Sequence, residues 1–516
     1  MQFLNYYSVF FNLFAMIVMT FFSYFRLKKN KQPDVFTKTY FICALVFFNL
    51  FIPLLFQLSY KENTFSYSQL LLCMLFGFFS CNILTLLCRI LSFLKKQYFI
   101  LSDSASFNKM KYGIIIFYVS TVLLYSWKPA NIVEWVSVWY GTNYNLGLGS
   151  RFFLGSVLHF FSDGFVDKQT VASFCFYSLV LLLGLISYCL NKVIISVETR
   201  LRPGIIWLVL LYLFSPAYVL AYIEHLNFGR LEVYGYIISL IGMICFHGLK
   251  NIYVKYGILT FLSIISLAIY QGFIFLYYPI LLLVMIYDIL ISQKEKIKKA
   301  ILAAISVGIS CITFLFFQFY TFVYAKTVDE FVQQVGLISN VAVSKKAVTY
   351  ELFTSIEAIY LELMLPYIRT CLPYEQLFIT LLLLFPLICI FILFYIYAAQ
   401  KTKKTYFLKK PYIYFLMVNF ALFPQFALNI DWGRWLIVLF NLLFFEMLYL
   451  IYLKDTGIMY ALKICTIWVK KHMIAALLIL LYISLLSYFD ANSFFFAPAE
   501  QILKFFHFRT SVNFYI

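Results

Sequence analysis

Three arginines follow glycine in short polar stretches between apolar segments. The stretches are Gly147-Leu148-Gly149-Ser150-Arg151, Gly229-Arg230 and Gly433-Arg434. Planar guanidinium groups suit phosphate oxygens because they donate several hydrogen bonds in a fixed geometry. Glycine lets the backbone approach a ligand closely. The pattern predicts a phosphate or diphosphate site at these arginines. The alternatives are a flexible turn from which Arg151 reaches lipid headgroups, and acid–arginine ion pairs that close tight turns.

Acidic side chains accompany the arginines. A hydroxyl group that attacks a substrate needs a carboxylate or histidine close enough to take its proton. Glu224 and Asp431 are favoured because each precedes a Gly-Arg pair. Glu134 and His225 are further candidates, and the sequence does not rank the acids.

Aromatic residues occur in the same stretches and suit the faces of sugars or the headgroup region of a membrane. Trp135, Trp139 and Tyr140 belong to a segment, 131–140, that we expect to form a short helix in the membrane interface. Tyr270 and Gln271 interrupt an apolar stretch, which suggests a broken helix lining a cavity or a plain turn. Trp432 stands between Asp431 and Gly433.

The elements that position these residues follow from composition. The chain has 516 residues, of which 64% are hydrophobic and 12% charged. These values exclude a soluble globular protein and a disordered chain. Apolar runs near 20 residues recur throughout, so we predict an all-α, polytopic membrane protein in which residues 1–516 form one domain. About 14 spans are expected: 5–25, 39–59, 69–94, 112–127, 170–190, 205–223, 233–248, 256–271, 274–291, 300–324, 374–398, 412–428, 435–453 and 473–489.

The distribution of charge predicts the orientation. The net charge is +18, and the connections after odd-numbered spans, such as the one from Lys454 to Lys471, are all basic. Basic loops stay in the cytoplasm, so we expect an external N-terminus and a charge that serves orientation, with no nucleic-acid partner. The external side then carries two long loops, 128–169 and 325–373, and the three short polar stretches that contain Arg230, Tyr270 and Arg434.

Both long loops are expected to contain amphipathic helices. In the first, an apolar helix is predicted at 152–161, directly after Arg151. In the second, Glu351, Glu357 and Glu362 fall among apolar residues at near-helical spacing. This spacing indicates a helix with a solvated face, or a lid over the external side.

An external site of arginines, acids and aromatics suits the transfer of sugars from a lipid carrier. Nucleotide sugars are absent outside the cell, so an activated sugar arrives there on a polyprenyl phosphate or diphosphate. Arginine can stabilise the charge of the leaving group without a metal. The sequence has no CxxC or HExxH motif, and we expect neither a metal nor a cofactor.

The layout resembles the Wzy-type polymerases of O-antigen and capsule, and is similar to the wider GT-C class of polytopic glycosyltransferases. The resemblance lies in the many aromatic-rich spans, the basic cytoplasmic loops, the two large outer loops and the outer arginines. It implies a bacterial inner-membrane enzyme whose active site faces the periplasm or exterior. It also implies an undecaprenyl-diphosphate-linked glycan donor and acceptor, membrane lipid around the chain, and a chain-length regulator as a further partner.

Three alternatives remain. A GT-C enzyme would add side-branch sugars from an undecaprenyl-phosphate donor. A flippase for lipid-linked oligosaccharides would carry charged residues inside its spans, of which Glu446 is an example. A membrane O-acyltransferase is the weakest, because it needs a histidine deep in a span, and His225 and His247 lie near span ends.

Overall fold

The described part of the chain begins after its first quarter. The computed structural model describes residues 134–218, 228–292, 295–354, 372–401, 419–428 and 432–486, together with residues 132, 358, 361 and 365. The chain divides into two compact units, Met1–Tyr98 and Phe99–Ile516, and every described residue lies in the second. The predicted spans 5–25, 39–59, 69–94 and 112–127 lie outside the described residues, as do the candidate residues Glu224, His225 and Asp431.

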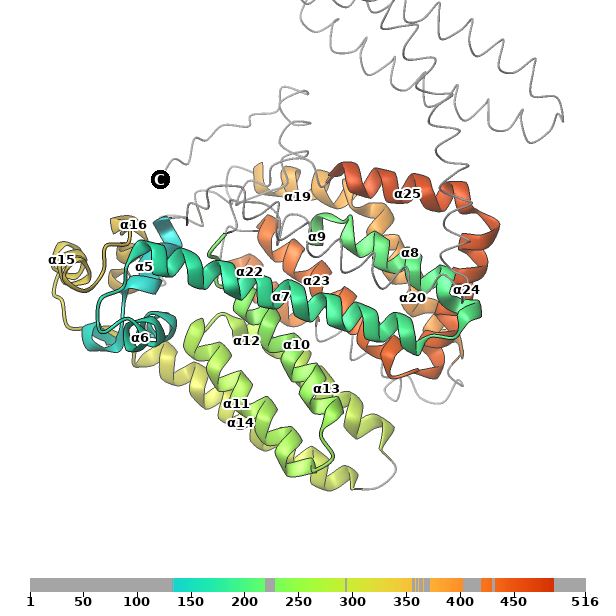
Figure 1. Ribbon diagram of the computed structural model, residues 1–516, viewed down its shortest axis with the longest axis horizontal. Coiled ribbons are helices and arrows are strands. Elements are labelled where there is room, and N and C mark those ends of the chain that lie inside the picture. The colour runs from blue at the N-terminus through green and yellow to red at the C-terminus, as the bar shows by residue number, and fades with distance from the viewer. Residues whose placement is uncertain are drawn as a thin grey trace, which may run out of the picture. The chain divides into compact units, whose positions relative to one another are not determined.

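The described unit is predominantly helical (Figure 1). Its longer helices are α7 (Lys168–Ser196), α8 (Arg202–Leu213), α10 (Glu232–Gly248), α11 (Ile252–Ile269), α13 (Tyr278–Ile291), α14 (Lys296–Phe319), α19 (Leu372–Leu383), α20 (Phe385–Lys401), α23 (Trp432–Tyr452), α24 (Thr456–Lys471) and α25 (Met473–Leu486). The shorter elements are α5 (Glu134–Gly141), η2 (Tyr144–Leu146), β1 (Gly147–Leu148), α6 (Phe152–Phe161), η3 (Thr199–Leu201), α9 (Pro216–Tyr218), α12 (Phe273–Leu276), β2 (Phe322–Val323), α15 (Val328–Ile338), α16 (Lys345–Val348), η6 (Thr349–Phe353), η9 (Phe420–Leu422) and α22 (Phe423–Leu428).

Five segments of the described chain are long and apolar enough to cross a membrane. They are α7, α11, the combined α12–α13 segment, α14 and α23. A sixth results if α24 and the helix after it, which are bent by 102°, count as one broken span. Helices suit the hydrocarbon because every backbone donor and acceptor is satisfied within the segment. The chain is therefore an all-α membrane protein, and the total of 14 spans stays a prediction.

Most predicted spans in the described region coincide with helices. The spans 170–190, 256–271, 274–291 and 435–453 correspond to α7, α11, α12–α13 and α23. Local sequence sets several helix starts: the Asp167 carboxylate accepts a hydrogen bond from the Gln169 N–H at the start of α7. Asn251 accepts bonds from the N–H groups of Tyr253 and Val254 at the start of α11. These caps satisfy donors that have no partner within the helix.

Two sequence-based expectations need correction. The predicted span 205–223 is not one continuous helix, because α8 ends at Leu213 and α9 begins at Pro216. Proline lacks the N–H that would continue the helix and suits a helix start instead. The basic connection from Lys454 to Lys471 is a helix, α24, rather than a featureless loop. One side of α24 is buried against α8 and α20, and Lys463, Lys470 and Lys471 are exposed.

The two long loops fold together into a structure that we call the cap, residues 134–167 and 322–354 (left side of Figure 1). Strand β1 pairs antiparallel with β2, and Val166 pairs with Ser339. Gly147, at φ 149°, permits the first pairing because a Cβ there would lie 2.3 Å from the Phe322 carbonyl oxygen. The amide of Asn340 donates to Asp167 at 2.6 Å. The predicted helix of the first loop is present as α6, at the predicted bounds 152–161, and the second loop contains the amphipathic α15. Of the residues on which the second-loop prediction rests, Glu351 lies in η6, and Glu357 and Glu362 lie outside the described residues.

Helix α5 packs against α6, α15 and α16 within the cap. Trp139 and Tyr140, expected as contacts for sugar or lipid, are 1% and 0% exposed and pack against protein instead. Their place at headgroup level stays a prediction. Helix α6 packs so closely on α5 that a Cβ at Gly155 would lie 2.8 Å from the Trp139 carbonyl oxygen. The Tyr140 hydroxyl donates to the Gly229 carbonyl at 2.7 Å. These contacts exclude lipid and water from both aromatic rings.

Candidate functional site

An ion pair joins the first turns of two long helices. Arg434, the third residue of α23, pairs with Glu232, the first residue of α10, and their side chains are 16% and 14% exposed. The carboxylate is stabilised at this position because the N-terminus of a helix carries partial positive charge. Arg434 also lies over the Trp435 ring, with its central guanidinium carbon 5.1 Å from the ring centroid.

A shallow pocket opens beside this pair. Its lining comes from the loop before α10 and the first turns of α10 and α23: Arg230, Glu232, Val233, Tyr236, Arg434, Ile437 and Val438. We call it the arginine pocket. Among these residues two guanidinium groups accompany a single carboxylate, so the described lining carries an excess of one positive charge. A partly buried excess charge attracts an anion.

Glu232 is ionised in this setting. Burial favours its neutral form, but the positive charges of Arg434 and Arg230 outweigh burial and lower the pKa of the carboxyl below its ordinary value. Glu232 precedes the predicted span 233–248 and lies at the rim of the helix bundle. A carboxylate held here can orient the arginines and can accept a proton from a hydroxyl group bound beside it.

A second arginine site lies in the cap. Arg151 directly precedes α6 and forms an ion pair with Glu351 at 2.8 Å. Its guanidinium carbon lies 4.5 Å from the centroid of the Tyr270 ring and 5.1 Å from that of Trp139. Cation–π contacts of this kind fix the orientation of the guanidinium plane. The hydroxyl of the adjacent Ser150 is hydrogen-bonded to Gln271, which ties the cap to the turn between α11 and α12.

Tyr270 connects the two arginine sites. The charges of both ion pairs, Arg151–Glu351 and Arg434–Glu232, act on its hydroxyl group. From its ring a series of edge-to-face contacts runs to the arginine pocket, with centroid distances of 5.3 Å to Phe273, 4.7 Å from Phe273 to Tyr277, and 5.0 Å from Tyr277 to Tyr236. Gly235 makes room for this series, because a Cβ there would lie 2.2 Å from the Tyr277 ring. Arginines far apart in the sequence therefore share one aromatic wall.

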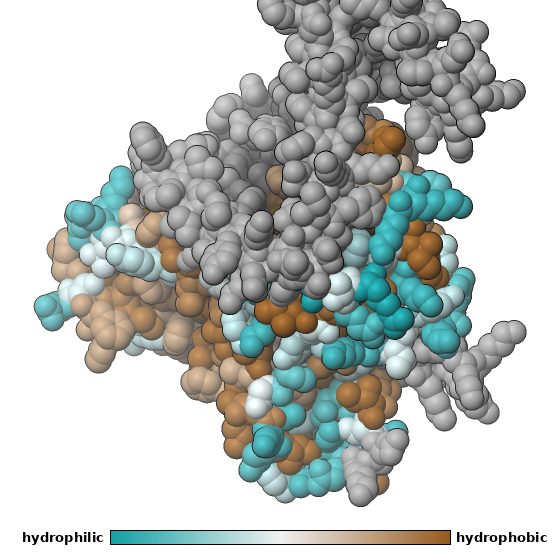
Figure 2. Space-filling model, turned by 45° about the vertical axis from the view of Figure 1, so that its right-hand side comes forward, coloured by the Kyte–Doolittle hydropathy of each residue, from teal (hydrophilic) through white to brown (hydrophobic). Residues whose placement is uncertain are grey.

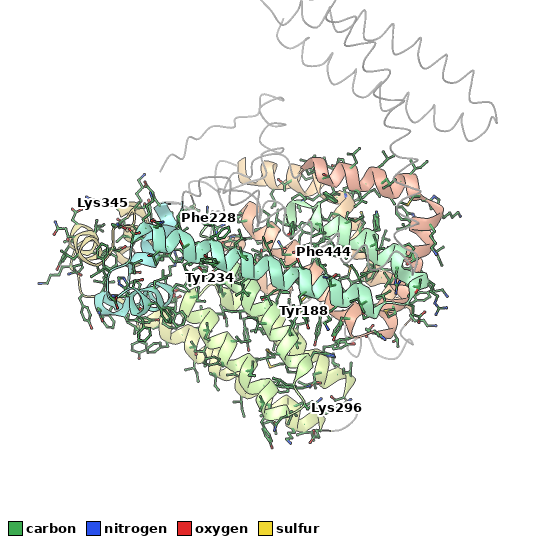
Figure 3. The ribbon with its side chains drawn as sticks, in the orientation of Figure 1. Tyr188, Phe228, Tyr234, Lys296, Lys345 and Phe444 are labelled. Carbon is green, nitrogen blue, oxygen red and sulfur yellow. The ribbon has the colours of Figure 1, made fainter. Side chains whose placement is uncertain are left out.

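The other predicted contact residues have structural partners. Trp135 stacks on Tyr350 with centroids 6.2 Å apart. The Trp432 indole N–H donates to the Phe426 carbonyl at 2.8 Å, so this ring connects α23 to α22. The Glu134 side chain is exposed in the first turn of α5. Figure 3 labels Tyr234, whose hydroxyl is hydrogen-bonded to that of Tyr140 at 3.1 Å and so joins α10 to the cap.

The roles of Glu232 and Glu351 as arginine partners are absent from the sequence-based assignment. The sequence places a nearby acid before Arg230 and Arg434 and none beside Arg151, whereas the observed partners of Arg434 and Arg151 come from distant segments. The available signal for Glu232 is its place directly before an apolar run, where an acid favours a helix start. Tyr277 belongs to Tyr277-Tyr278-Pro279, which interrupts the same apolar stretch as Tyr270 and Gln271. Tyr236, which completes the aromatic wall, carries no local signal because it lies within an apolar segment.

Comparisons do not connect this site to known proteins. No family model, curated protein or solved structure matches the chain. Within the part of the chain that the structure describes, no three histidine, cysteine, aspartate or glutamate residues are grouped so that they could hold a metal ion.

Proposed function

We propose that the chain is a membrane glycosyltransferase that polymerises undecaprenyl-diphosphate-linked oligosaccharide repeat units at the extracytoplasmic face. The observation that supports this best is the arginine pocket, in which Arg230 and Arg434 accompany one carboxylate beside an aromatic wall. The pocket offers charge for a diphosphate. The aromatic residues offer flat apolar surfaces of the kind that pack on sugar rings.

The backbone strengthens the case for an anion. Helices α10 and α23 both begin beside the pocket, at Glu232 and Trp432. Helix N-termini present N–H groups and positive partial charge to a ligand. A diphosphate there would develop negative charge as it leaves the sugar, and arginines close to it would stabilise that charge.

The proposed step transfers a growing glycan from its lipid carrier to a lipid-linked repeat unit. A hydroxyl oxygen of the acceptor sugar attacks the anomeric carbon of the donor, and the bond from that carbon to the diphosphate oxygen breaks. The hydroxyl proton passes to a carboxylate, and undecaprenyl diphosphate leaves with the electron pair. Glu232 joins Glu134, Glu224 and Asp431 as a candidate for this base, because it is ionised and lines the pocket.

A side-branch transferase of the GT-C class would use the same pocket with an undecaprenyl-phosphate sugar as donor. The flippase alternative has one observation in its favour. Glu446, in the middle of α23, is 1% exposed and accepts a hydrogen bond from Asn419 at 3.0 Å. Ionisable groups inside membrane helices commonly serve transport.

Reconstitution distinguishes these functions. The purified chain in liposomes is given a lipid-linked repeat unit, and the products are separated by size. Polymerase activity gives a ladder of lengths, a side-branch transferase gives one addition from a monophosphate donor, and a flippase gives translocated but unchanged substrate. We expect Arg434→Lys to lose the ladder, since ammonium cannot reproduce the guanidinium geometry. Arg200→Ala, at an exposed ion pair with Glu198, is the matched control. A full ladder from Arg434→Lys would refute the proposed diphosphate site.

A further inference from the structure

A larger cavity lies toward the opposite ends of the helices that form the arginine pocket. It opens between α7, α8, α10 and α23. Its lining is mainly apolar and aromatic: Ile186, Tyr188, Cys189, Leu190, Lys192, Val193, Tyr212, Leu240, Met243, Ile244, His247, Gly248, Phe445, Leu448, Tyr449 and Tyr452. We call it the apolar cavity. Lys192 is the lining residue with a permanent charge.

The apolar cavity has a closed floor and a charged mouth. Tyr212 and Phe445 at the floor are 0% and 3% exposed, whereas Lys192 and His247 are exposed. The Lys192 ammonium lies 5.4 Å from the centroid of the Tyr188 ring. The His247 ring lies edge-on to Tyr452 with centroids 5.0 Å apart. A long apolar molecule with a polar end fits this arrangement with its polar end at the mouth.

The mouth lies on a basic side of the described unit. Helices α7 and α10 end near it, and Lys250 and Lys255 follow directly after α10. Figure 2, which turns the right-hand side of Figure 1 forward, shows hydrophilic residues gathered over this side. In Figure 3, Tyr188 lies well away from Lys345 of the cap. The rings of Tyr236 and Phe445, 6.0 Å apart, separate the floor from the arginine pocket, so the two sites are distinct.

We propose that the apolar cavity binds an acyl chain of an anionic glycerophospholipid, with its phosphate at Lys192 and His247. Hydrocarbon is the natural filling because water gains few hydrogen bonds from apolar walls and the cavity belongs to membrane helices. Lys192 carries a positive charge at the mouth, and lysines near a membrane surface attract anionic lipids. We therefore expect an anionic headgroup.

Native mass spectrometry of the full chain tests this site. The detergent-purified protein receives phosphatidylglycerol or phosphatidylcholine with identical acyl chains, and the bound fraction is measured. We expect preferential retention of phosphatidylglycerol, and about a fivefold loss of affinity in Lys192→Ala, the loss expected for one lysine near a membrane surface. Lys346→Ala removes the same charge from an exposed residue of the cap, outside the lining and away from the basic side, and should leave binding unchanged.

A second pair of variants tests the cavity itself. Ile244→Trp adds bulk at a half-buried lining position and should abolish retention of phosphatidylglycerol. Ile241→Trp adds the same bulk on α10 outside the lining and should leave it intact. Equal binding of both lipids, or undiminished binding to Lys192→Ala and Ile244→Trp, would overturn the proposal. These outcomes are independent of glycan transfer, since neither variant alters the arginine pocket.

Discussion

Arg434 forms an ion pair with Glu232, a residue 202 positions earlier in the chain. The pair joins the starts of α23 and α10 and lies within the arginine pocket. A partly buried guanidinium therefore depends on a carboxylate from another helix. The ion pair therefore connects the two helices, and it also holds the Arg434 guanidinium at the pocket, where an anion could bind.

Removing only one residue of this ion pair should lower the stability of the fold. Arg434→Ala leaves the Glu232 carboxylate partly buried without its partner, and we expect a loss of about 3 kcal/mol in the free energy of unfolding. The double variant Glu232→Gln/Arg434→Gln should lose clearly less than the sum of the single variants Glu232→Gln and Arg434→Gln, because it removes both charges of the pair together. Thermal unfolding in detergent micelles measures both. Additive losses would show that the pair contributes nothing to stability.

Glu351 should compete with anionic ligands for Arg151. In Glu351→Gln the guanidinium keeps its contacts with Trp139 and Tyr270 but loses its carboxylate partner at 2.8 Å. Affinity for inorganic diphosphate, measured by calorimetry, should rise about fivefold, which corresponds to about 1 kcal/mol. Asp329→Asn is the matched control, because Asp329 pairs with Lys345 at an exposed position of the cap. Unchanged affinity in Glu351→Gln would assign Arg151 a purely structural role.

Helices α5 and α6 pack so closely that one added methyl group at their contact should destabilise the fold. A Cβ at Gly155 would lie 1.8 Å from the Thr142 carbonyl oxygen, so Gly155→Ala must displace α6 and, with it, Arg151. We expect a destabilisation of about 2 kcal/mol or more and lower activity. Gly336→Ala, on an exposed face of α15 where a Cβ meets nothing within 4 Å, should be neutral or stabilising. The two variants are compared by thermal unfolding, and equal stability would contradict the close packing.

The attachment of the cap to α7 should weaken in acid. The side-chain hydrogen bond from Asn340, followed by the backbone bond from Gln169, lowers the pKa of Asp167 below its ordinary value of 3.8. A lowered pKa in the folded state stabilises the fold above the unfolded pKa, and this contribution is lost as pH falls through the folded value. Hydrogen exchange around Val166 and Ser339 should therefore increase below about pH 4. Asp167→Asn should remove this pH dependence; an identical acid response in that variant would contradict it.

A variant of Glu446 distinguishes a glycosyltransferase from a transporter. Glu446→Gln keeps an oxygen that can accept the bond from Asn419 but removes the ionisable group. A glycosyltransferase should then make its products at a rate within about twofold of the unaltered chain, since the loss of a charge outside the site leaves the transition state unchanged. A flippase that uses this carboxylate should lose translocation of a fluorescent lipid-linked sugar in the same liposomes.

Several features of the fold follow from local sequence, and others do not. The apolar runs predict α7, α11, α13 and α23, and the helix at 152–161 has its predicted bounds. The burial of Trp139 and the helical form of α24 were not predicted. An amphipathic segment next to a membrane can lie at the lipid surface or against protein, and its composition is the same in both cases. The contacts of α5 with α6, and of α24 with α8 and α20, show that both segments pack against protein.

The sequence by itself determined that this is a helical membrane protein, where many of its helices begin, and which arginines stand between them. Hydrophobic length and helix caps act over a few neighbouring residues, so composition and spacing are sufficient for these features. Only the tertiary structure decided that Glu232 and Glu351 are the partners of Arg434 and Arg151, and that Tyr270 contacts both Arg151 and the aromatic wall of the arginine pocket. Such pairings depend on how helix ends from distant parts of the chain pack together, which local spacing does not specify.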